Sequence, residues 1–231
     1  MSRSMHITAA DGHRFEIARA DPPNAATSRP KGGVIVLHAI YGLTDHIRGV
    51  CDKWAQAGYS AVAPAHFDRV GPGRVYGYAA DGAEAGRQCY AATNETNITA
   101  EIAACRDALA GSGTIIVSGF CTGGSSAWLA SATLDGIGAQ VNFYGSHVAS
   151  RHLALHPRCP TIIHYGDNDH VVPIADVERI RAANPGVELH VYPGAGHAFF
   201  NPEQAHYDDA AATLAWQRSL AFLDRVLPRA T

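Results

Sequence analysis

Short apolar runs recur along the chain and alternate with longer segments in which apolar and polar residues mix. Most of the central runs are apolar at every position rather than at every second one, which is typical of parallel strands covered on both faces. These runs predict strands at residues 14–18, 33–38, 60–63, 114–118, 140–144, 161–165 and 188–192.

The segments between these strands carry helical patterns. They predict helices at residues 45–57, 98–110, 124–132, 174–183 and 203–226. Before the last of them, Asn201 and Pro202 predict an N-cap followed by a proline at the first helical position. Alternation of strands and helices over most of the chain predicts an α/β fold, with a doubly wound, mostly parallel sheet and helices on both faces.

The length of 231 residues fits one domain of ordinary α/β size. Residues 21–31 contain three prolines and read as a surface loop rather than a linker. Residues 67–97 are long, carry glycines and tyrosines and lack clear periodicity. Because a stretch of this kind in a compact domain is often functional, we expect residues 67–97 to form a cap or lid over the active site.

Composition excludes several classes of protein. A hydrophobic fraction of 47% and a net charge of −3 indicate a globular protein with no charge-based reason to bind nucleic acid or an anionic membrane. No apolar stretch is long enough to span a bilayer, and no secretory leader is visible, so we expect a cytoplasmic protein. Five widely spaced cysteines without a C-x-x-C pair argue against a disulfide framework or a zinc site, and no metal is expected.

The sequence Gly-Phe-Cys-Thr-Gly-Gly at 119–124 follows one of the predicted strands directly. It matches the G-x-C-x-G form of the nucleophile elbow, with cysteine where α/β-hydrolases usually carry serine. Glycines are needed there because the nucleophile sits on a sharp strand-to-helix turn. The N–H groups at the start of the following helix favour an anion at the same point.

Two later strands end in acid and histidine motifs. The strand at 161–165 runs into Gly-Asp-Asn-Asp-His-Val-Val-Pro at 166–173, and Gly-His-Ala-Phe at 196–199 follows the next strand. Acid and histidine follow the nucleophile in this chain order in α/β-hydrolases, and open α/β sheets build their sites at the carboxyl ends of strands. These positions predict Cys121 as nucleophile, His197 as base and Asp169 as the acid that orients the base.

Each of these residues also has a purely structural interpretation. Cys121 fits a small buried hydrophobe, Asp169 a helix cap, and His197 a loop histidine bound by the backbone. Asp167 competes with Asp169 for either aspartate role. The shared chain order and strand placement favour one catalytic explanation over three separate structural ones.

With these three motifs the sequence resembles the dienelactone hydrolase family over nearly its whole length, with weaker matches in Ile-Tyr-Gly-Leu at 40–43 and Phe-Tyr-Gly at 143–145. The resemblance implies a single-domain α/β-hydrolase with a Cys-His-Asp triad and no metal or organic cofactor. It further implies an oxyanion hole made by the backbone N–H groups of Thr122 and Ile40. The elbow geometry predicts the first of these independently.

The resemblance also implies substrate contacts from Tyr144, which would line the pocket, and from Arg87 as a family arginine before a long helix. Two positions depart from the family. The family's glutamate near the resting cysteine is Ala39 here, and its arginine four residues beyond the histidine is Asn201. The usual gate on the cysteine and the usual clamp on a substrate carboxylate are therefore not expected in their family form.

The sequence thus predicts a carboxymethylenebutenolidase-like hydrolase that cleaves small-molecule esters or lactones through a thioester on Cys121. Without the glutamate, Cys121 is expected to rest as a thiolate paired with His197. Two alternatives remain: a protein that binds electrophiles or senses oxidants without turnover, and a hydrolase of another activated carbon centre.

Overall fold

The computed structural model describes residues 1–25 and 27–227. The chain divides into two compact units, Met1–Val117 and Ser118–Thr231. Each unit is compact by itself and is described separately. The single domain and the lid at residues 67–97 therefore both stay predictions.

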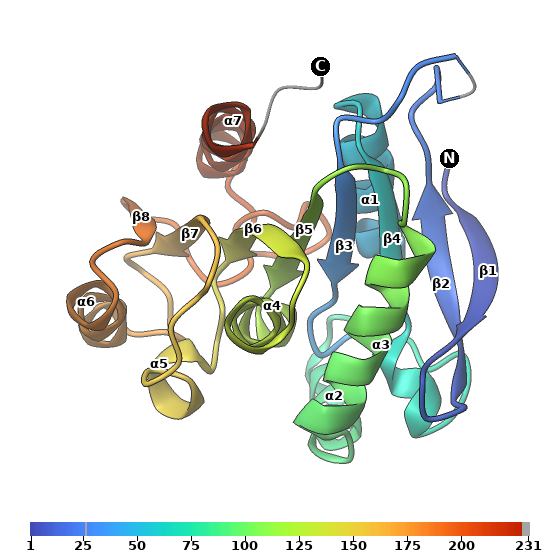
Figure 1. Cartoon of the computed structure of the whole chain (residues 1–231). Helices are drawn as coiled ribbons and strands as arrows, with labels where there is room; N and C mark the ends of the chain where they lie inside the picture. The colour runs from blue at the N-terminus through green and yellow to red at the C-terminus, as the bar shows by residue number, and fades with distance from the viewer. Residues whose placement is uncertain (26, 228–231) are drawn as a thin grey trace. The chain divides into compact units, whose positions relative to one another are not determined.

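The first unit contains four complete strands and four helices. The strands are β1 (Arg3–Thr8), β2 (Arg14–Ala20), β3 (Gly33–Leu37) and β4 (Ser60–Pro64). The helices are α1 (Asp45–Gln56), a 3-10 helix η1 (His66–Arg69), α2 (Ala80–Ala91) and α3 (Glu95–Ala108). Every residue of β3 and β4 is buried, and α1 and α3 cover opposite faces of these strands (Figure 1).

Helix α1 shows why the chain is helical there. Thr44 caps it by accepting a hydrogen bond from the Ile47 N–H, which satisfies one of the free donors of the first turn. Val50 and Trp54, four positions apart on one face of the helix, are buried with Ile47. The helix therefore has a capped start and an apolar stripe facing the strands.

The second unit contains the later strands and helices. Strand β5 (Ile115–Phe120) begins in the first unit and ends in the second. It is followed by α4 (Thr122–Thr133), β6 (Ile137–Phe143), α5 (Val148–Arg151), β7 (Thr161–Gly166), α6 (Ile174–Ala183), β8 (Glu188–Tyr192) and α7 (Asp209–Val226). Helices α4 and α6 lie on one side of these strands, and α7 lies on the other (Figure 1).

The hydrogen-bonded strand order is β1-β2-β4-β3-β5-β6-β7-β8. Strand β2 is antiparallel to β1 and to β4, whereas β3 pairs with β4, β6 with β7 and β7 with β8 in parallel. This order confirms the predicted mostly parallel sheet of the α/β class. Within each unit, helices cover both faces of the strands, as a doubly wound sheet requires.

The predicted strands and most predicted helices agree with the structure to within a few residues, but the start of the last helix is wrong. Helix α7 begins at Asp209, and Asp208 caps it through a hydrogen bond from the Ala211 N–H. Asn201 instead closes a turn of its own, since its side chain accepts a hydrogen bond from the Glu203 N–H. A local side-chain turn of this kind competes with helix initiation, so the helix begins only at Asp209.

Residues 67–97 have more regular structure than their sequence indicates, because they include α2 and the start of α3. Helix α2 lies close to the loop after β3. A Cβ atom added to Gly86 would come within 2.2 Å of the carbonyl oxygen of Ile40, so only glycine permits this approach. The segment predicted as a cap therefore packs, within the first unit, against the backbone of a predicted oxyanion-hole residue.

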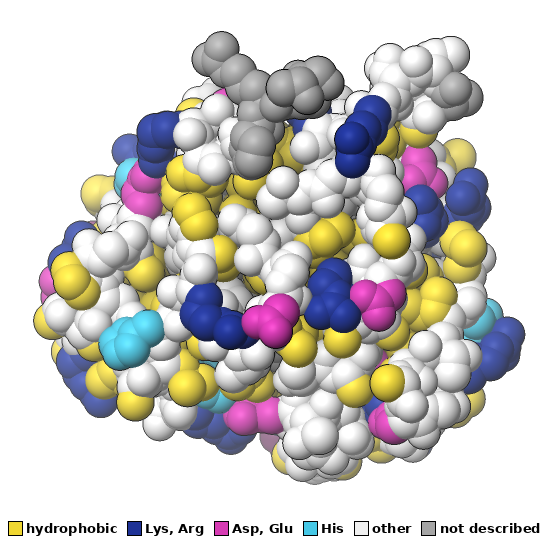
Figure 2. Space-filling model, in the orientation of Figure 1, with side chains coloured by type: hydrophobic (Ala, Val, Ile, Leu, Met, Phe, Trp, Pro, Cys, Tyr) yellow, Lys and Arg dark blue, Asp and Glu magenta, His cyan; other side chains and the backbone are white. Residues whose placement is uncertain are grey.

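The surface carries charges of both signs. On the face drawn in Figure 2, Lys and Arg side chains lie beside Asp and Glu side chains, with no broad patch of one sign. None of the helices in residues 1–25 and 27–227 is long and apolar enough to cross a membrane.

Candidate active site

Cys121 occupies the sharp turn between β5 and α4. Its φ of 54° and ψ of −117° lie where residues with a Cβ atom are rarely found. Such strain is typical of functional positions, and the nucleophile elbow is the known case at a strand-to-helix turn. A Cβ atom on Gly119 would lie 2.1 Å from the carbonyl oxygen of Gly123, so the turn depends on that glycine.

The structure brings Asp169 and His197 into direct contact. The Oδ2 atom of Asp169 lies 2.7 Å from Nδ1 of His197, and both side chains are buried. The other carboxylate oxygen accepts hydrogen bonds from the backbone N–H groups of Val171, at 2.7 Å, and Val172, at 2.9 Å. Three donors therefore fix the carboxylate, and the carboxylate in turn fixes the imidazole ring.

Cys121 and His197 shift each other's pKa, although Nε2 of His197 makes no hydrogen bond of ordinary geometry in the described residues. Burial by itself raises the pKa of the Cys121 thiol, but the charge of His197 and hydrogen bonds from His197, Ser146 and the Thr122 N–H bring that pKa below its usual value. Burial by itself lowers the pKa of His197, but the charge of Cys121 and hydrogen bonding from the ring to Asp169 and Cys121 raise it to about 10. Both directions favour a thiolate beside an imidazolium.

Asp167, the alternative acid, makes a different contact. Its Oδ1 atom accepts a hydrogen bond of 2.6 Å from the Gly194 N–H, which ties together the loops that follow β7 and β8. Asp169 is thus the aspartate that contacts the imidazole, and Asp167 is the one that holds the loop carrying it.

Tyr144 packs against the imidazole of His197. Its ring centroid lies 5.0 Å from that of His197 and 5.4 Å from that of Phe199, and its φ is 43°. Tyr144 is buried and packs against the histidine ring, and its role in lining a pocket stays a prediction. Sequence analysis missed its neighbour Ser146, whose backbone N–H donates to the Cys121 carbonyl oxygen at 3.1 Å.

Three further predicted residues lie in the first unit. Ile40 and Ala39 are partly exposed in the loop after β3. Arg87 is exposed on α2 and forms an ion pair with Glu84 one helical turn away. That pairing is an ordinary surface contact and does not require a substrate. Asn201 is buried and engaged in its own turn, so it offers no charged replacement for the family arginine.

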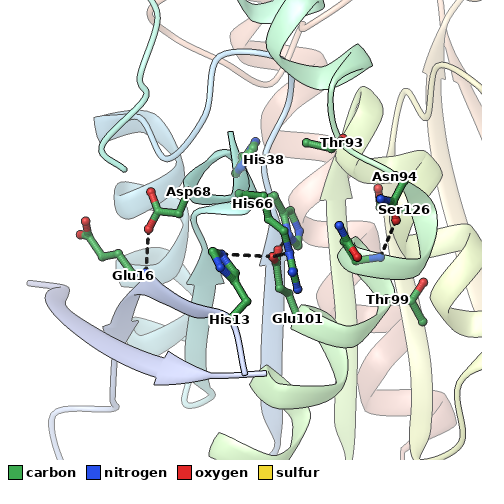
Figure 3. A network of polar contacts seen from close by, with 12 residues as sticks. His13, Glu16, His38, His66, Asp68, Thr93, Asn94, Thr99, Glu101 and Ser126 are labelled. Atoms are coloured by element: carbon green, nitrogen blue, oxygen red, sulfur yellow. Dashed lines mark hydrogen bonds and ion pairs between the residues drawn. The ribbon is translucent and has the colours of Figure 1, made fainter. Parts of the chain in front are cut away.

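A buried polar network in the first unit was also missed by sequence analysis. The fully buried carboxylate of Glu101 contacts His66 Nδ1 at 2.5 Å and Arg69 Nε at 2.7 Å, and His13 Nε2 lies 3.8 Å away (Figure 3). The His38 ring lies 5.4 Å from the His66 ring. We call these five residues the histidine cluster. Its members come from distant parts of the sequence, so no short motif reveals it.

Potential metal ligands do not gather into a site in the described residues. No group of three or more His, Cys, Asp and Glu side chains there is arranged to hold a metal ion. In the histidine cluster, Arg69 and His66 take up the two oxygens of the carboxylate.

Similarity to known proteins extends over most of the chain. The model of the dienelactone hydrolase family matches residues 17–227. A Synechocystis protein named "Putative carboxymethylenebutenolidase" is 33% identical over 208 residues, which cover 80% of this chain and 82% of the relative. A Salmonella typhimurium protein of the same name is 31% identical and covers 88% of this chain and 83% of its own length.

A solved structure is also similar. The crystal structure of a "Putative Dienelactone Hydrolase" from Klebsiella pneumoniae subsp. pneumoniae MGH 78578 has a TM-score of 0.85 and 27% sequence identity. The match covers 97% of this chain and 98% of that one.

Proposed function

We propose a catalytic route for this chain, which belongs to the dienelactone hydrolase family and acts as a hydrolase of ester or lactone bonds. In this proposal Cys121 is the nucleophile, His197 the proton carrier and Asp169 the group that orients it. One observation carries it: a cysteine at positive φ on a strand-to-helix turn, whose thiol pKa is lowered by a buried histidine bound through Nδ1 to a buried aspartate.

The first half of the reaction is acylation. The Cys121 thiolate attacks the carbonyl carbon of the substrate, a C–S bond forms and the carbonyl electron pair moves onto oxygen. Collapse of this oxyanion restores the C=O bond and breaks the bond to the alcohol oxygen, which takes the proton held by His197. A thioester and a neutral imidazole remain.

The second half is hydrolysis of the thioester. His197, now neutral, takes a proton from water, and the hydroxide attacks the thioester carbon. Collapse of the second oxyanion expels the Cys121 thiolate and leaves the carboxylic acid product. The negative charge returns to sulfur and the proton to His197, which restores the starting pair.

The proposed oxyanion hole consists of the backbone N–H groups of Thr122 and Ile40. Thr122 is the first residue of α4, and hydrogen bonding from its N–H helps to lower the pKa of the Cys121 thiol, which supports its role beside the reacting atom. The position of Ile40 in this role follows from the family resemblance. One such donor is worth about 3 kcal/mol of transition-state stabilisation in subtilisin, which has an unrelated fold.

The proposed substrate is a small ester or lactone without an obligatory carboxylate. Arg87 is paired with Glu84, and the position of the other family arginine is the buried Asn201. Tyr144, packed on His197, is the proposed apolar wall of the pocket. All five cysteines are free, which supports a cytoplasmic location, where thiols stay reduced.

Replacing single cysteines tests the proposal. The Cys121→Ala variant should lose measurable turnover of a panel of lactones and aryl esters, neutral and anionic, because no nucleophile remains. Cys159→Ala is the matched control, since Cys159 is also partly exposed, and burial raises the pKa of its thiol to about 11. Turnover retained by purified Cys121→Ala would refute the cysteine mechanism.

A second candidate is an electrophile-binding or redox-sensing protein on the same fold. The partly exposed Cys121 thiol with a lowered pKa favours it, because such thiols react with electrophiles and oxidants. Rapid mixing with an aryl ester separates the two functions. A single burst of released phenol without steady-state turnover indicates the sensor, and a burst followed by turnover indicates the hydrolase.

A further inference from the structure

We propose that the hydroxyl group of Ser146 is a further catalytic group, which donates a hydrogen bond to the Cys121 sulfur and stabilises the thiolate. The inference rests on the proposed function, because it takes the sulfur of Cys121 as the reacting atom. It goes beyond that function by naming a residue that lies outside the triad and the oxyanion hole.

Backbone hydrogen bonds place Ser146 beside the elbow. The Ser146 N–H donates to the Cys121 carbonyl oxygen at 3.1 Å, and the His147 N–H donates to the Ser125 hydroxyl oxygen at 2.8 Å. The loop after β6 is therefore bound to the first turn of α4 at two successive residues. Ser146 cannot move away from the nucleophile without breaking these bonds.

Asn142, at the end of β6, holds the same loop from the other side. Its fully buried amide donates to the Gly124 carbonyl oxygen at 2.8 Å and accepts from the Gly145 N–H at 3.1 Å. The Tyr165 hydroxyl donates to the Gly145 carbonyl oxygen at 3.1 Å. Because these contacts join the residue before Ser146 to both α4 and β7, the serine is rigidly positioned.

The Ser146 hydroxyl is buried and makes no hydrogen bond of ordinary geometry in the described residues. Ser146 acts as a side-chain hydrogen-bond donor in lowering the pKa of the Cys121 thiol, so the sulfur is the acceptor to which this hydroxyl can turn. A hydroxyl carries one donor proton, and leaving it unused in a buried place costs free energy. Burial raises the pKa of the Cys121 thiol, and the charge of His197 together with hydrogen bonding from His197, Ser146 and the Thr122 N–H brings it below its usual value.

A hydroxyl beside the sulfur acts differently from a carboxylate, the group that the family resemblance leads one to expect near the resting cysteine. A carboxylate near the sulfur repels a thiolate and can accept the proton of the thiol. A hydroxyl instead donates a hydrogen bond to the thiolate. The sulfur of a thioester is a poor acceptor, so this hydrogen bond weakens on acylation and re-forms as the thiolate leaves. Ser146 therefore favours the resting thiolate and its departure in the second half of the reaction.

The test measures the pKa of the Cys121 thiol by the pH dependence of thiolate absorbance near 240 nm and of alkylation by iodoacetamide. We expect Ser146→Ala to raise this pKa by about one unit, since a hydrogen bond to a charged group is worth that much. Ser146→Thr, which keeps the hydroxyl, should restore it. Ser126→Ala is the matched control, because that buried serine of α4 donates to the Thr122 carbonyl oxygen instead.

Ser146→Gly removes the hydroxyl without adding a titrating group, and it should raise the pKa in the same way if Ser146→Ala fails to fold. Equal thiol pKa values in the folded Ser146→Ala or Ser146→Gly variant and the unchanged protein would overturn the role of Ser146. That outcome is separate from failure of the proposed function, which shows as turnover by Cys121→Ala. A shifted pKa together with turnover by Cys121→Ala would uphold the Ser146 contact and refute the cysteine mechanism.

Discussion

Among residues 1–25 and 27–227, each compact unit contains a buried carboxylate–imidazole pair. In the second unit Asp169 contacts His197 at 2.7 Å, and in the first unit Glu101 contacts His66 at 2.5 Å. By distance and burial the two pairs are nearly alike. They differ in the groups that surround them.

The remaining oxygen of Asp169 is bound by backbone N–H groups, which carry no net charge, so the carboxylate can stabilise an imidazolium. The other oxygen of Glu101 is bound by the Arg69 guanidinium, which already neutralises that carboxylate. Beyond the imidazoles, His197 faces Cys121, whereas His66 faces another imidazole, His38. The reactivity of a carboxylate–imidazole pair therefore depends on the group beyond the imidazole rather than on the geometry of the pair.

Replacing each histidine in turn should give the largest difference in activity between the two carboxylate–imidazole pairs. We expect His197→Gln to lower kcat by about 10⁵-fold, because it removes the proposed proton carrier and the proposed cation beside the thiolate. His66→Gln should leave kcat nearly unchanged while lowering stability. The measurement is steady-state hydrolysis of an aryl ester together with urea unfolding. A similar loss of kcat in both variants would show that the histidine cluster takes part in the reaction.

The two carboxylates should separate activity from stability. Asp169→Asn is expected to lower kcat by about 10⁴-fold by misplacing the imidazole proton. Glu101→Gln should lower the free energy of unfolding by about 3 kcal/mol, because it leaves a partly buried arginine without its buried partner. Asp167→Asn is the control for the first variant, since an amide oxygen can still accept the hydrogen bond from Gly194. A loss of kcat in Asp167→Asn as large as in Asp169→Asn would contradict the assignment.

Low pH should lower the stability of the protein through His38, a member of the histidine cluster. Burial and the nearby His66 lower the pKa of His38 to about 3, whereas the unfolded chain binds a proton near 6.5. The unfolded state therefore gains protons as pH falls from 6.5 towards 3, and stability falls with it. We expect about 2 kcal/mol of loss between pH 6.5 and 5 from this residue.

The sign is opposite for His197, whose raised pKa gives stability that is complete below pH 6.5 and lost as pH rises through about 10. Urea unfolding at several pH values measures both limbs. The acid limb should become shallower in His38→Phe, although His46 and His164, whose pKa values are also lowered by burial, keep part of it. An unchanged acid limb in that variant would exclude a neutral buried His38.

The strands and the elbow could be predicted because each depends on residues that are neighbours in sequence. Continuous apolar runs give β3 and β7, and Gly119 and Gly123 frame a turn that only small residues permit. The order of Asp169 and His197 along the chain, each after a strand, was enough to predict that they would meet.

The rest depends on contacts between distant residues. Strand β1 has exposed, mixed residues and forms by pairing with β2, so its own pattern is weak. The histidine cluster joins residues 13, 38, 66, 69 and 101, and no local pattern links them. Ser146 likewise reaches Cys121 only after the loop beyond β6 has folded back onto α4.

The backbone conformation of Cys121 sets stability against the proposed activity. Glycine would adopt this φ and ψ with less strain than cysteine, because it has no Cβ atom to crowd the turn. Selection for heat resistance alone would therefore favour glycine at position 121, whereas selection for turnover would keep the thiol of the nucleophile that we propose. Variants selected for heat resistance and variants selected for turnover should therefore differ first at position 121.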